Sequence, residues 1–184
     1  MINASGPWIN DTLNKNIKIK SKNKIRLVKG SHIITKKLYK EDVAFTFQNT
    51  DKRIIFVIPY KKHFSLIGTT EVEVKSPENN GISNQEIQYL IKSVNNYLKK
   101  QISKKDIVDT YSGIRPLIED FKEASKVTRD YVFDLHIVKK LPLLNIYGGK
   151  LTTYRKLSEK VLLDLKKFLP KTKVGPWTSK KKLI

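Results

Sequence analysis

The sequence predicts an α+β protein built on a largely antiparallel sheet with one helix packed on it. Between residues 43 and 74, three short stretches rich in β-branched and aromatic residues are separated by short polar links. This spacing is typical of sequential antiparallel strands. Residues 83–100 show a clean helical period instead. A strand pattern at residues 141–147 then leads through two glycines into a second helical pattern.

The first 34 residues predict two extended segments and little else. Residues 2–8 predict a short strand end followed by a turn of small residues. Residues 11–24 are polar and lysine-rich without a clear period, so we expect a loop there. Residues 25–34 predict a strand with a kink at Gly30.

The expected antiparallel strands comprise residues 43–48, 53–60 and 64–72, and the link that contains His63 is expected to be an exposed turn. The helix at residues 83–100 has a clear start, because Ser83 and Glu86 form a capping-box pattern. Its apolar face, which would pack on the sheet, comprises Ile87, Leu90, Ile91, Val94, Tyr97 and Leu98.

Two further strands are expected after this helix. Residues 108–117 form one strand, which ends at an Arg-Pro pair. Residues 131–138 alternate as a strand with one buried face, which puts His136 on the solvent face. The polar residues 118–126 are expected to form a loop.

The turn at Gly148 and Gly149 is the most informative stretch. Glycine lets a ligand approach the backbone, and the first N–H groups of the following helix attract electron-rich groups. Thr152 and Thr153 add hydroxyl groups, and Lys150 adds a positive charge. A tight turn before an ordinary helix also explains this pattern. The helix is expected to end near Leu169, with an apolar face of Leu151, Tyr154, Leu157, Val161, Leu162 and Leu165.

The composition excludes several classes of function. The formal net charge of +20 suggests a nucleic acid or an anionic membrane surface as partner. Only five basic residues are arginines, however, and the lysines are scattered. We find no module with the arginine and aromatic side chains of sequence-specific readers, so no specific nucleic acid is expected. The lack of cysteine excludes disulfides and thiolate chemistry and fits a reducing compartment.

Three side chains are candidates for chemistry. Arg115 and Arg129 are arginines in a chain that otherwise uses lysine, and a forked guanidinium suits a phosphate or a carboxylate. The alternatives are a surface arginine before a turn for Arg115, and a simple pair with Asp130 for Arg129. His32 can act as a general base near neutral pH, although a lone histidine in a strand is more often structural.

Residues 148–157, Gly-Gly-Lys-Leu-Thr-Thr-Tyr-Arg-Lys-Leu, resemble the last flavin-contacting motif of the FAD-dependent (aerobic) glycerol-3-phosphate dehydrogenases. Other strings resemble this family in the order it requires, at residues 2–8, 29–33, 108–117 and 127–131. The resemblance implies the substrate domain of a flavin-dependent oxidoreductase of the glutathione-reductase or amino-acid-oxidase type. Its C-terminal helix would belong to the FAD-binding domain.

The same resemblance implies a domain organisation. Residues 1–24 would be part of the FAD-binding domain and a loop, and residues 25–140 would form the substrate domain. Residues 141–170 would return to the FAD-binding domain, and residues 171–184 would be a linker to a C-terminal helical domain.

Carried over residue by residue, the resemblance implies His32 as the base and Arg115 as the arginine beside the substrate and the flavin. Arg115, Arg129 and Lys150 would bind the substrate. The expected cofactor contacts are Ala4, Gly6, Gly148, Gly149, Lys150, Leu151, Thr152 and Thr153. No metal site is expected.

The implied reaction is oxidation of sn-glycerol 3-phosphate to dihydroxyacetone phosphate by hydride transfer to FAD. Electrons would pass to a quinone at the inner face of the cytoplasmic membrane, with the enzyme a peripheral membrane protein of the cytoplasm. The chain has no Gly-x-Gly-x-x-Gly string, which in the family precedes the first motif found here.

We therefore expect either a fragment without activity of its own or a chain completed by a separately encoded N-terminal piece. Two alternatives remain. One is a basic module that binds nucleic acid or an anionic membrane, and the other is a flavin-dependent oxidoreductase for another small anionic substrate.

Overall fold

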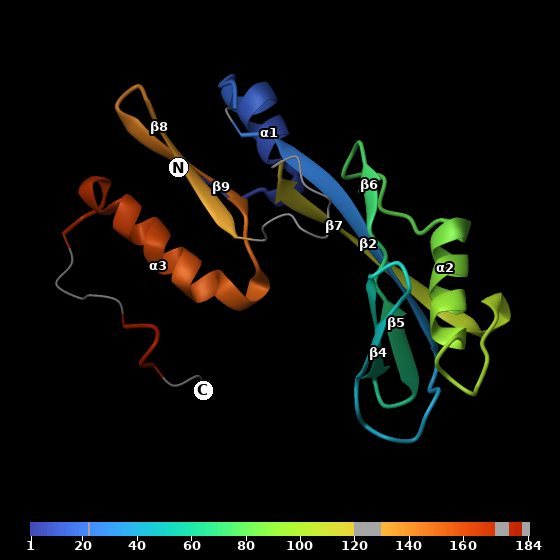
Figure 1. Ribbon diagram of the computed structural model, residues 1–184. Coiled ribbons are helices and arrows are strands. Elements are labelled where there is room, and N and C mark those ends of the chain that lie inside the picture. The colour runs from blue at the N-terminus through green and yellow to red at the C-terminus, as the bar shows by residue number, and fades with distance from the viewer. Residues whose placement is uncertain (22, 120–129, 172–176, 182–184) are drawn as a thin grey trace. The chain divides into compact units, whose positions relative to one another are not determined.

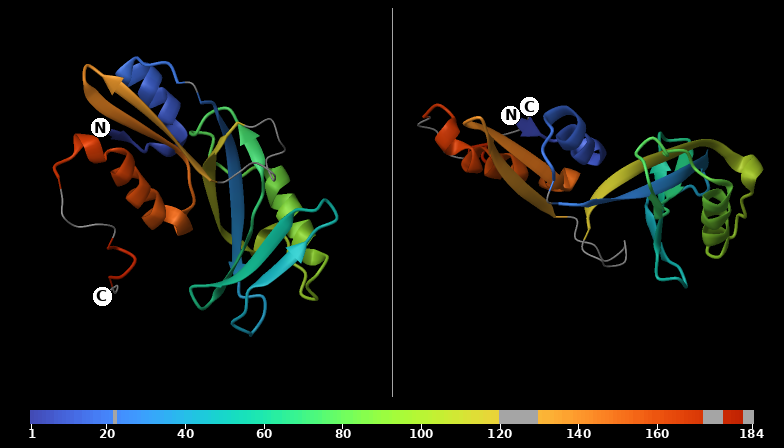
Figure 2. Two further views of the ribbon diagram at one scale, coloured as in Figure 1. Left: turned by 60° about the vertical axis from the view of Figure 1, so that its left-hand side comes forward. Right: turned by 90° about the horizontal axis from the view of Figure 1, so that it is seen from above.

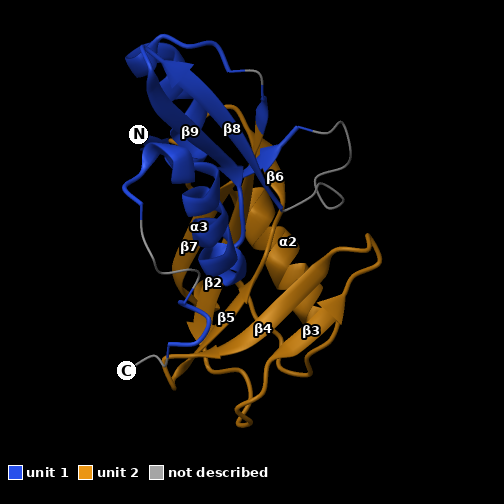
Figure 3. Ribbon diagram, turned by 90° about the vertical axis from the view of Figure 1, so that its left-hand side faces the viewer, with its two compact units in different colours: residues 1–25, 116–121, 127–184 blue, residues 26–115, 122–126 orange. Residues whose placement is uncertain are grey.

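The computed structural model describes residues 1–21, 23–119, 130–171 and 177–181 (Figure 1; two further views in Figure 2). Its chain forms two compact units (Figure 3). Unit 1 comprises residues 1–25 and 116–121 and the chain from residue 127 onwards, and unit 2 contains residues 26–115. The chain therefore leaves unit 1 near Ile25 and returns to it after Arg115.

Unit 2 is organised around a six-stranded sheet with the order β3-β4-β5-β2-β6, in which β7 also pairs with β2. The pairs β2–β5, β2–β6, β3–β4 and β4–β5 are antiparallel. These pairings confirm the predicted α+β class and its antiparallel sheet. The strands are β2 (Ile25–Lys36), β3 (Phe45–Gln48), β4 (Ile54–Tyr60), β5 (Phe64–Gly68), β6 (Val72–Val74) and β7 (Ile107–Ile118).

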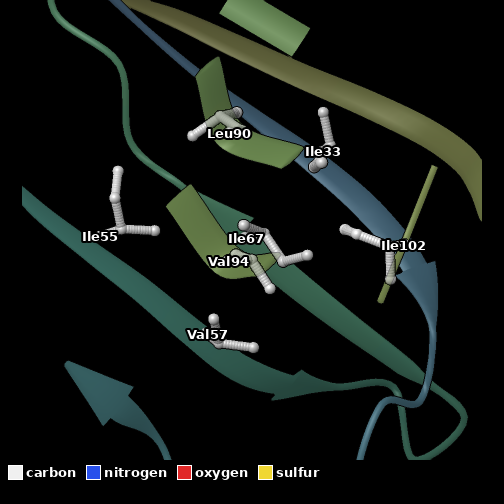
Figure 4. Close-up of a cluster of buried hydrophobic side chains, with 7 residues drawn as sticks. All are labelled: Ile33, Ile55, Val57, Ile67, Leu90, Val94 and Ile102. Atoms are coloured by element: carbon white, nitrogen blue, oxygen red, sulfur yellow. The ribbon is translucent and has the colours of Figure 1, made fainter. Parts of the chain in front are cut away.

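One face of this sheet is covered by helix α2 (Asn84–Asn95). Strand β4 shows the alternation that the cover requires, since Ile55 and Val57 are fully buried while Ile54 and Phe56 are exposed. The buried cluster between helix and sheet comprises Ile33, Ile55, Val57, Ile67, Leu90, Val94 and Ile102 (Figure 4).

Helix α2 begins as the sequence predicts and ends earlier. The Ser83 hydroxyl accepts a hydrogen bond from the Glu86 N–H, and the Glu86 carboxylate accepts one from the Ser83 N–H, which confirms the capping box. The helix ends at Asn95 because the Asn95 side-chain amide pairs with both the N–H and the C=O of Ile102. Those two bonds turn the chain back, so the predicted continuation to residue 100 is wrong.

Unit 1 contains a three-stranded sheet with the order β1-β9-β8. Strand β1 (Ile2–Asn3) runs parallel to β9 (Leu141–Gly148), and β8 (Tyr131–Val138) runs antiparallel to it. Helix α3 (Tyr154–Asp164) packs on β9, where Leu144, Val161 and Leu165 form a buried cluster. Leu151, Tyr154 and Leu162, which the sequence placed on the same apolar face, are exposed in this unit.

The segment predicted as a loop at residues 11–24 is helical in its first half. Helix α1 (Ile9–Asp11) continues into a π-helical turn at Thr12–Ile17. Ile9 and Leu13 are buried against Leu143 and Tyr147 of β9. The prediction was wrong because only two apolar positions one turn apart need to be buried here, and polar neighbours hide so short a period.

Strand β8 lies in unit 1, whereas the sequence placed residues 116–140 with the substrate domain. The reason is its pairing, because β8 runs along the whole of β9 from Tyr131 to Val138. Among the described residues, unit 2 thus contains residues 26–115, and the substrate domain of residues 25–140 stays a prediction.

Truncation of Leu90, which is fully buried between α2 and the sheet, tests this packing. We expect Leu90→Ala to lower the free energy of unfolding by roughly 2–5 kcal/mol, because it removes apolar contacts and leaves a cavity. Denaturant unfolding followed by far-UV circular dichroism measures the change. The exposed Gln88 on the same helix provides the control, and an equal loss in Gln88→Ala would contradict the described core.

Candidate functional site

His32 lies on β2 directly opposite Gly68 of β5. A side chain at position 68 would begin 2.0 Å from His32 Cδ2, so the imidazole occupies the space that Gly68 leaves. The aromatic ring of Tyr111, on β7, lies 5.8 Å from the imidazole centroid and is 60% exposed. The glycine therefore positions the His32 ring against the surface of the sheet.

Arg115, near the end of β7, depends on a second glycine. A side chain at Gly30 would begin 2.5 Å from Arg115 Nη2 and 2.7 Å from Thr69 Oγ1. The same Nη2 donates a hydrogen bond of 3.2 Å to Thr69 Oγ1. Gly30 is thus a place of close approach, where the sequence predicted a kink. Both predicted catalytic residues lie in unit 2. His32 is two residues after Gly30 on β2, and Gly30 is the glycine that Arg115 approaches.

The charges in this region favour a neutral imidazole. The pKa of His32 is lowered from its ordinary value of 6.5, first by burial and second by the positive charge of Arg115. The Nδ1 atom is buried and has no hydrogen-bond partner among the described residues. An imidazole that is neutral at pH 7 can accept a proton, which is the requirement for a general base.

A buried ionic network lies next to these residues. The Glu86 carboxylate is almost inaccessible and accepts hydrogen bonds from the hydroxyl groups of Ser31 (2.7 Å) and Thr70 (2.8 Å). Its second oxygen lies 2.9 Å from Lys29 Nζ, which also donates to the Gly81 carbonyl. Burial acts to raise the pKa of Glu86, but these donors and the Ser83 N–H outweigh it and lower the pKa to about 2.

The glycine turn lies in unit 1 and is exposed. Gly148 and Gly149 have φ values of +71° and +105°, which side chains other than glycine rarely adopt. Lys150 is the N-cap of the turn Leu151–Thr153 and provides no side-chain cap. No side chain caps the first N–H groups of this helical segment, and among them the Thr153 N–H donates to the Lys150 carbonyl. The Thr153 hydroxyl is used internally, because it donates to the Lys150 carbonyl.

The other predicted site residues vary in their surroundings. Ala4 is exposed, and Gly6 has a φ of +56° with open space where a side chain would begin. The residue just before this turn, Asn3, is buried, and its side-chain amide donates a hydrogen bond to Asn145 of β9. Arg129 lies outside the described residues.

The glycine turns of unit 1 are the candidate places for contact with a cofactor. Both turns carry glycine at positive φ, and neither Gly6 nor Gly149 has backbone atoms close to the position of a side chain. A model of the family described as FAD dependent oxidoreductase matches residues 1–155. The chain belongs to this family. FAD is the cofactor of the family, as the sequence led us to expect.

The chain is similar over nearly its whole length to named dehydrogenases. It is 46% identical over 182 residues to the aerobic glycerol-3-phosphate dehydrogenase of Escherichia coli, and 43% identical over 180 residues to the D-erythritol 1-phosphate dehydrogenase of Brucella abortus. Each match covers 97% of this chain and 36% of the relative. The chain thus spans about a third of the length of these relatives.

The fold is similar to that of a glycerol-3-phosphate dehydrogenase from Bacillus halodurans, solved in complex with FAD. The TM-score is 0.71 at 25% sequence identity, over 91% of this chain and 32% of the other. Among the described residues, no helix is long and apolar enough to cross a membrane.

Sequence reasoning missed the part that Glu86 plays beside the candidate site. It predicted Glu86 only as a capping residue, because the capping partner is three residues away while Ser31 and Thr70 are 55 and 16 residues away. One signal was present, since Lys29 directly follows the apolar pair Leu27 and Val28 within a strand, and a buried lysine needs an anionic partner.

The low pKa of Glu86 predicts a specific dependence of stability on pH. Because the pKa is about 2 in the folded chain and near 4.5 when unfolded, the charged carboxylate stabilises the fold above about pH 4.5. That contribution is lost as the pH falls from 4.5 towards 2. We expect Glu86→Gln to be less stable than the unmodified chain at pH 7, by roughly 3–5 kcal/mol, because it leaves Lys29 without its counter-ion.

The difference between the two proteins should shrink by about 3 kcal/mol on acidification to pH 2, and urea unfolding at a series of pH values measures it. Glu41→Gln, which removes an exposed carboxylate, provides the control. A difference that stays constant with pH would contradict the assignment.

Proposed function

We propose that this chain forms the substrate side and the flavin-facing turn of an FAD-dependent dehydrogenase that oxidises sn-glycerol 3-phosphate to dihydroxyacetone phosphate. One observation carries the proposal. His32, whose lowered pKa favours the neutral imidazole, and the cation Arg115 occupy the space that two glycines leave on the same sheet. The identity of 46% to the E. coli enzyme supports this choice of substrate.

His32 is proposed to remove the proton from the secondary hydroxyl group of the substrate. Its lowered pKa keeps the imidazole ready to accept a proton at neutral pH. Arg115 is proposed to bind the phosphate or to stabilise the alkoxide that develops as the proton leaves, because its guanidinium stays charged and is anchored on Thr69. Arg129 is proposed as a second cation for the phosphate.

The proposed cofactor contacts lie in the turns of unit 1. Ala4 and Gly6 would let the dinucleotide approach the backbone after β1, and Gly148 and Gly149 would do so before α3. The exposed N–H groups at the start of the helix, together with Lys150, would meet negative charge on the flavin. The remaining proposed contacts are Leu151, Thr152 and Thr153. When bound, FAD supplies the chemistry of accepting a hydride from the substrate carbon.

The whole reaction requires a pyrophosphate-binding segment that these 184 residues do not contain, since they have no Gly-x-Gly-x-x-Gly string. The segment would come from the same polypeptide or from a separately encoded one. We propose that this chain alone has no dehydrogenase activity. In the complete enzyme, electrons would pass to a quinone, with the enzyme peripheral to the inner face of the cytoplasmic membrane.

A second candidate substrate is D-erythritol 1-phosphate, because the named relative from Brucella abortus is 43% identical over 97% of this chain. Both candidates are phosphates of small polyols and would use the same base and the same cations. Parallel assays of the completed enzyme with the two compounds distinguish them.

Binding of FAD by the purified chain is the first test. We expect saturable binding, measured by quenching of flavin fluorescence, to weaken at least about tenfold in Gly149→Val, which corresponds to ~1.4 kcal/mol. The reason is that valine does not adopt the φ of +105° and would crowd Leu157. Lys150→Ala should weaken binding by a smaller factor, because it removes a charge and leaves the turn intact.

Lys156→Ala is the matched control, since it removes an exposed lysine from the following turn of the same segment. Equal weakening in Lys150→Ala and Lys156→Ala would indicate general attraction of an anion to a chain of net charge +20, and would contradict the proposed contact.

A further inference from the structure

The carboxylate of Glu86 is connected to far more groups than a capping box requires. Only 4% of the residue is exposed, although a carboxylate in the first turn of a helix normally faces solvent. One oxygen, Oε2, accepts from the Ser83 N–H and faces Lys29 Nζ. The other oxygen, Oε1, takes no part in the cap and accepts from Ser31 and Thr70.

One of the two groups that Oε1 binds is the immediate neighbour of His32, and the other is next to the residue that accepts a hydrogen bond from Arg115. Ser31 precedes His32 on β2, and Thr70 follows Thr69, whose hydroxyl accepts the hydrogen bond from Arg115. The two segments are also bonded directly, because the Ser31 N–H donates to Thr70 Oγ1 at 2.9 Å and the Thr70 N–H donates to the Ser31 carbonyl.

A third strand is attached to the same point. Ser112 of β7 lies 2.9 Å from Ser31, hydroxyl to hydroxyl, and Arg115 is three residues further along β7. The Oε1 atom thus connects helix α2 to the strand of His32, to the segment of Thr69 and, through Ser31, to the strand of Arg115.

We propose that Glu86 is a positioning residue for the reaction, whose Oε1 fixes the His32 imidazole and the Arg115 guanidinium through Ser31 and Thr70. The proposal rests on the proposed function of His32 and Arg115. Stability alone explains the network poorly, because a buried ion pair is often no more stabilising than apolar residues of similar size. Lys29 lies against the other carboxylate oxygen and balances the negative charge of Glu86. It thereby keeps the carboxylate ionised, so that Oε1 accepts both hydrogen bonds.

The test measures the position of His32 without requiring turnover. The imidazole signals are followed by NMR between about pH 5 and about pH 8 and are assigned by their loss in His32→Gln. Thr70→Val is the main variant, because valine keeps the shape of threonine and removes only the hydroxyl. Thr70→Ser restores a hydroxyl, and Val94→Ala weakens the packing of the same helix without contacting Glu86.

We expect Thr70→Val to raise the pKa of His32 towards 6.5, because a ring that is held less firmly against Gly68 and Arg115 gains contact with water. The Arg115 Nε–H signal should shift in the same variant. Thr70→Ser should restore both values, and Val94→Ala should leave both unchanged in spite of its lower stability. Ser31→Ala, which removes the other donor to Oε1, should act like Thr70→Val.

An unchanged His32 titration in folded Thr70→Val and Ser31→Ala would overturn the proposal, as would an equal shift in Val94→Ala. Failure of both variants to fold, with Thr70→Ser folded, would overturn it too, because the hydroxyl groups would then serve the fold. Neither NMR signal depends on FAD. If the chain shows the expected shifts but binds no FAD, the proposed function of the whole site is contradicted. The coupling of Glu86 to His32 is then still supported.

Discussion

The candidate site of unit 2 depends on the absence of side chains at two points of one sheet. Gly68 leaves room for the His32 ring, and Gly30 leaves room for the Arg115 guanidinium. Any side chain at either position would begin less than 3 Å from the functional group, so ring and guanidinium would have to move. Two glycines, which weaken a strand locally, are thus required for His32 and Arg115 to lie as close to the sheet as they do.

Electrostatics and packing act together around this arrangement. The guanidinium of Arg115 and the burial of His32 both disfavour a second positive charge, which keeps the imidazole neutral. Next to these residues, the buried Lys29 has Glu86 as its counter-ion, and Glu86 also accepts hydrogen bonds from Ser31 of β2 and from Thr70 between β5 and β6.

Much of the fold follows from local patterns in the sequence. The antiparallel strands, the start of α2 at Ser83 and the strand that leads into Gly148 were all predictable, because each depends on residues close to one another in the chain. The helix at residues 9–17 was not, since only Ile9 and Leu13 reveal it and their burial depends on β9, more than a hundred residues away. The early end of α2 has a similar cause in the Asn95–Ile102 pairing.

Part of the candidate site was likewise predictable from the sequence and part was not. The candidates for chemistry were identified from residue type and family resemblance, whereas spacing alone left His32 as an ordinary strand histidine. The supporting roles were not identified: Gly30 was predicted only as a kink and Glu86 only as a capping residue, while Gly68 and Thr69 acquire their importance only when segments distant in sequence are placed side by side. Partners of buried polar groups are set by tertiary structure, and a single sequence carries no local pattern for them.

Reduction of bound FAD by glycerol 3-phosphate tests the central claim most directly. This chain is combined with FAD and with the part of the E. coli relative that precedes the matched region, and the flavin absorbance is followed without oxygen. The account predicts loss of the oxidised flavin spectrum on addition of glycerol 3-phosphate, and a much slower loss with His32→Gln or Arg115→Lys. Flavin that is bound but stays oxidised, or that is reduced equally fast in both variants, would contradict it.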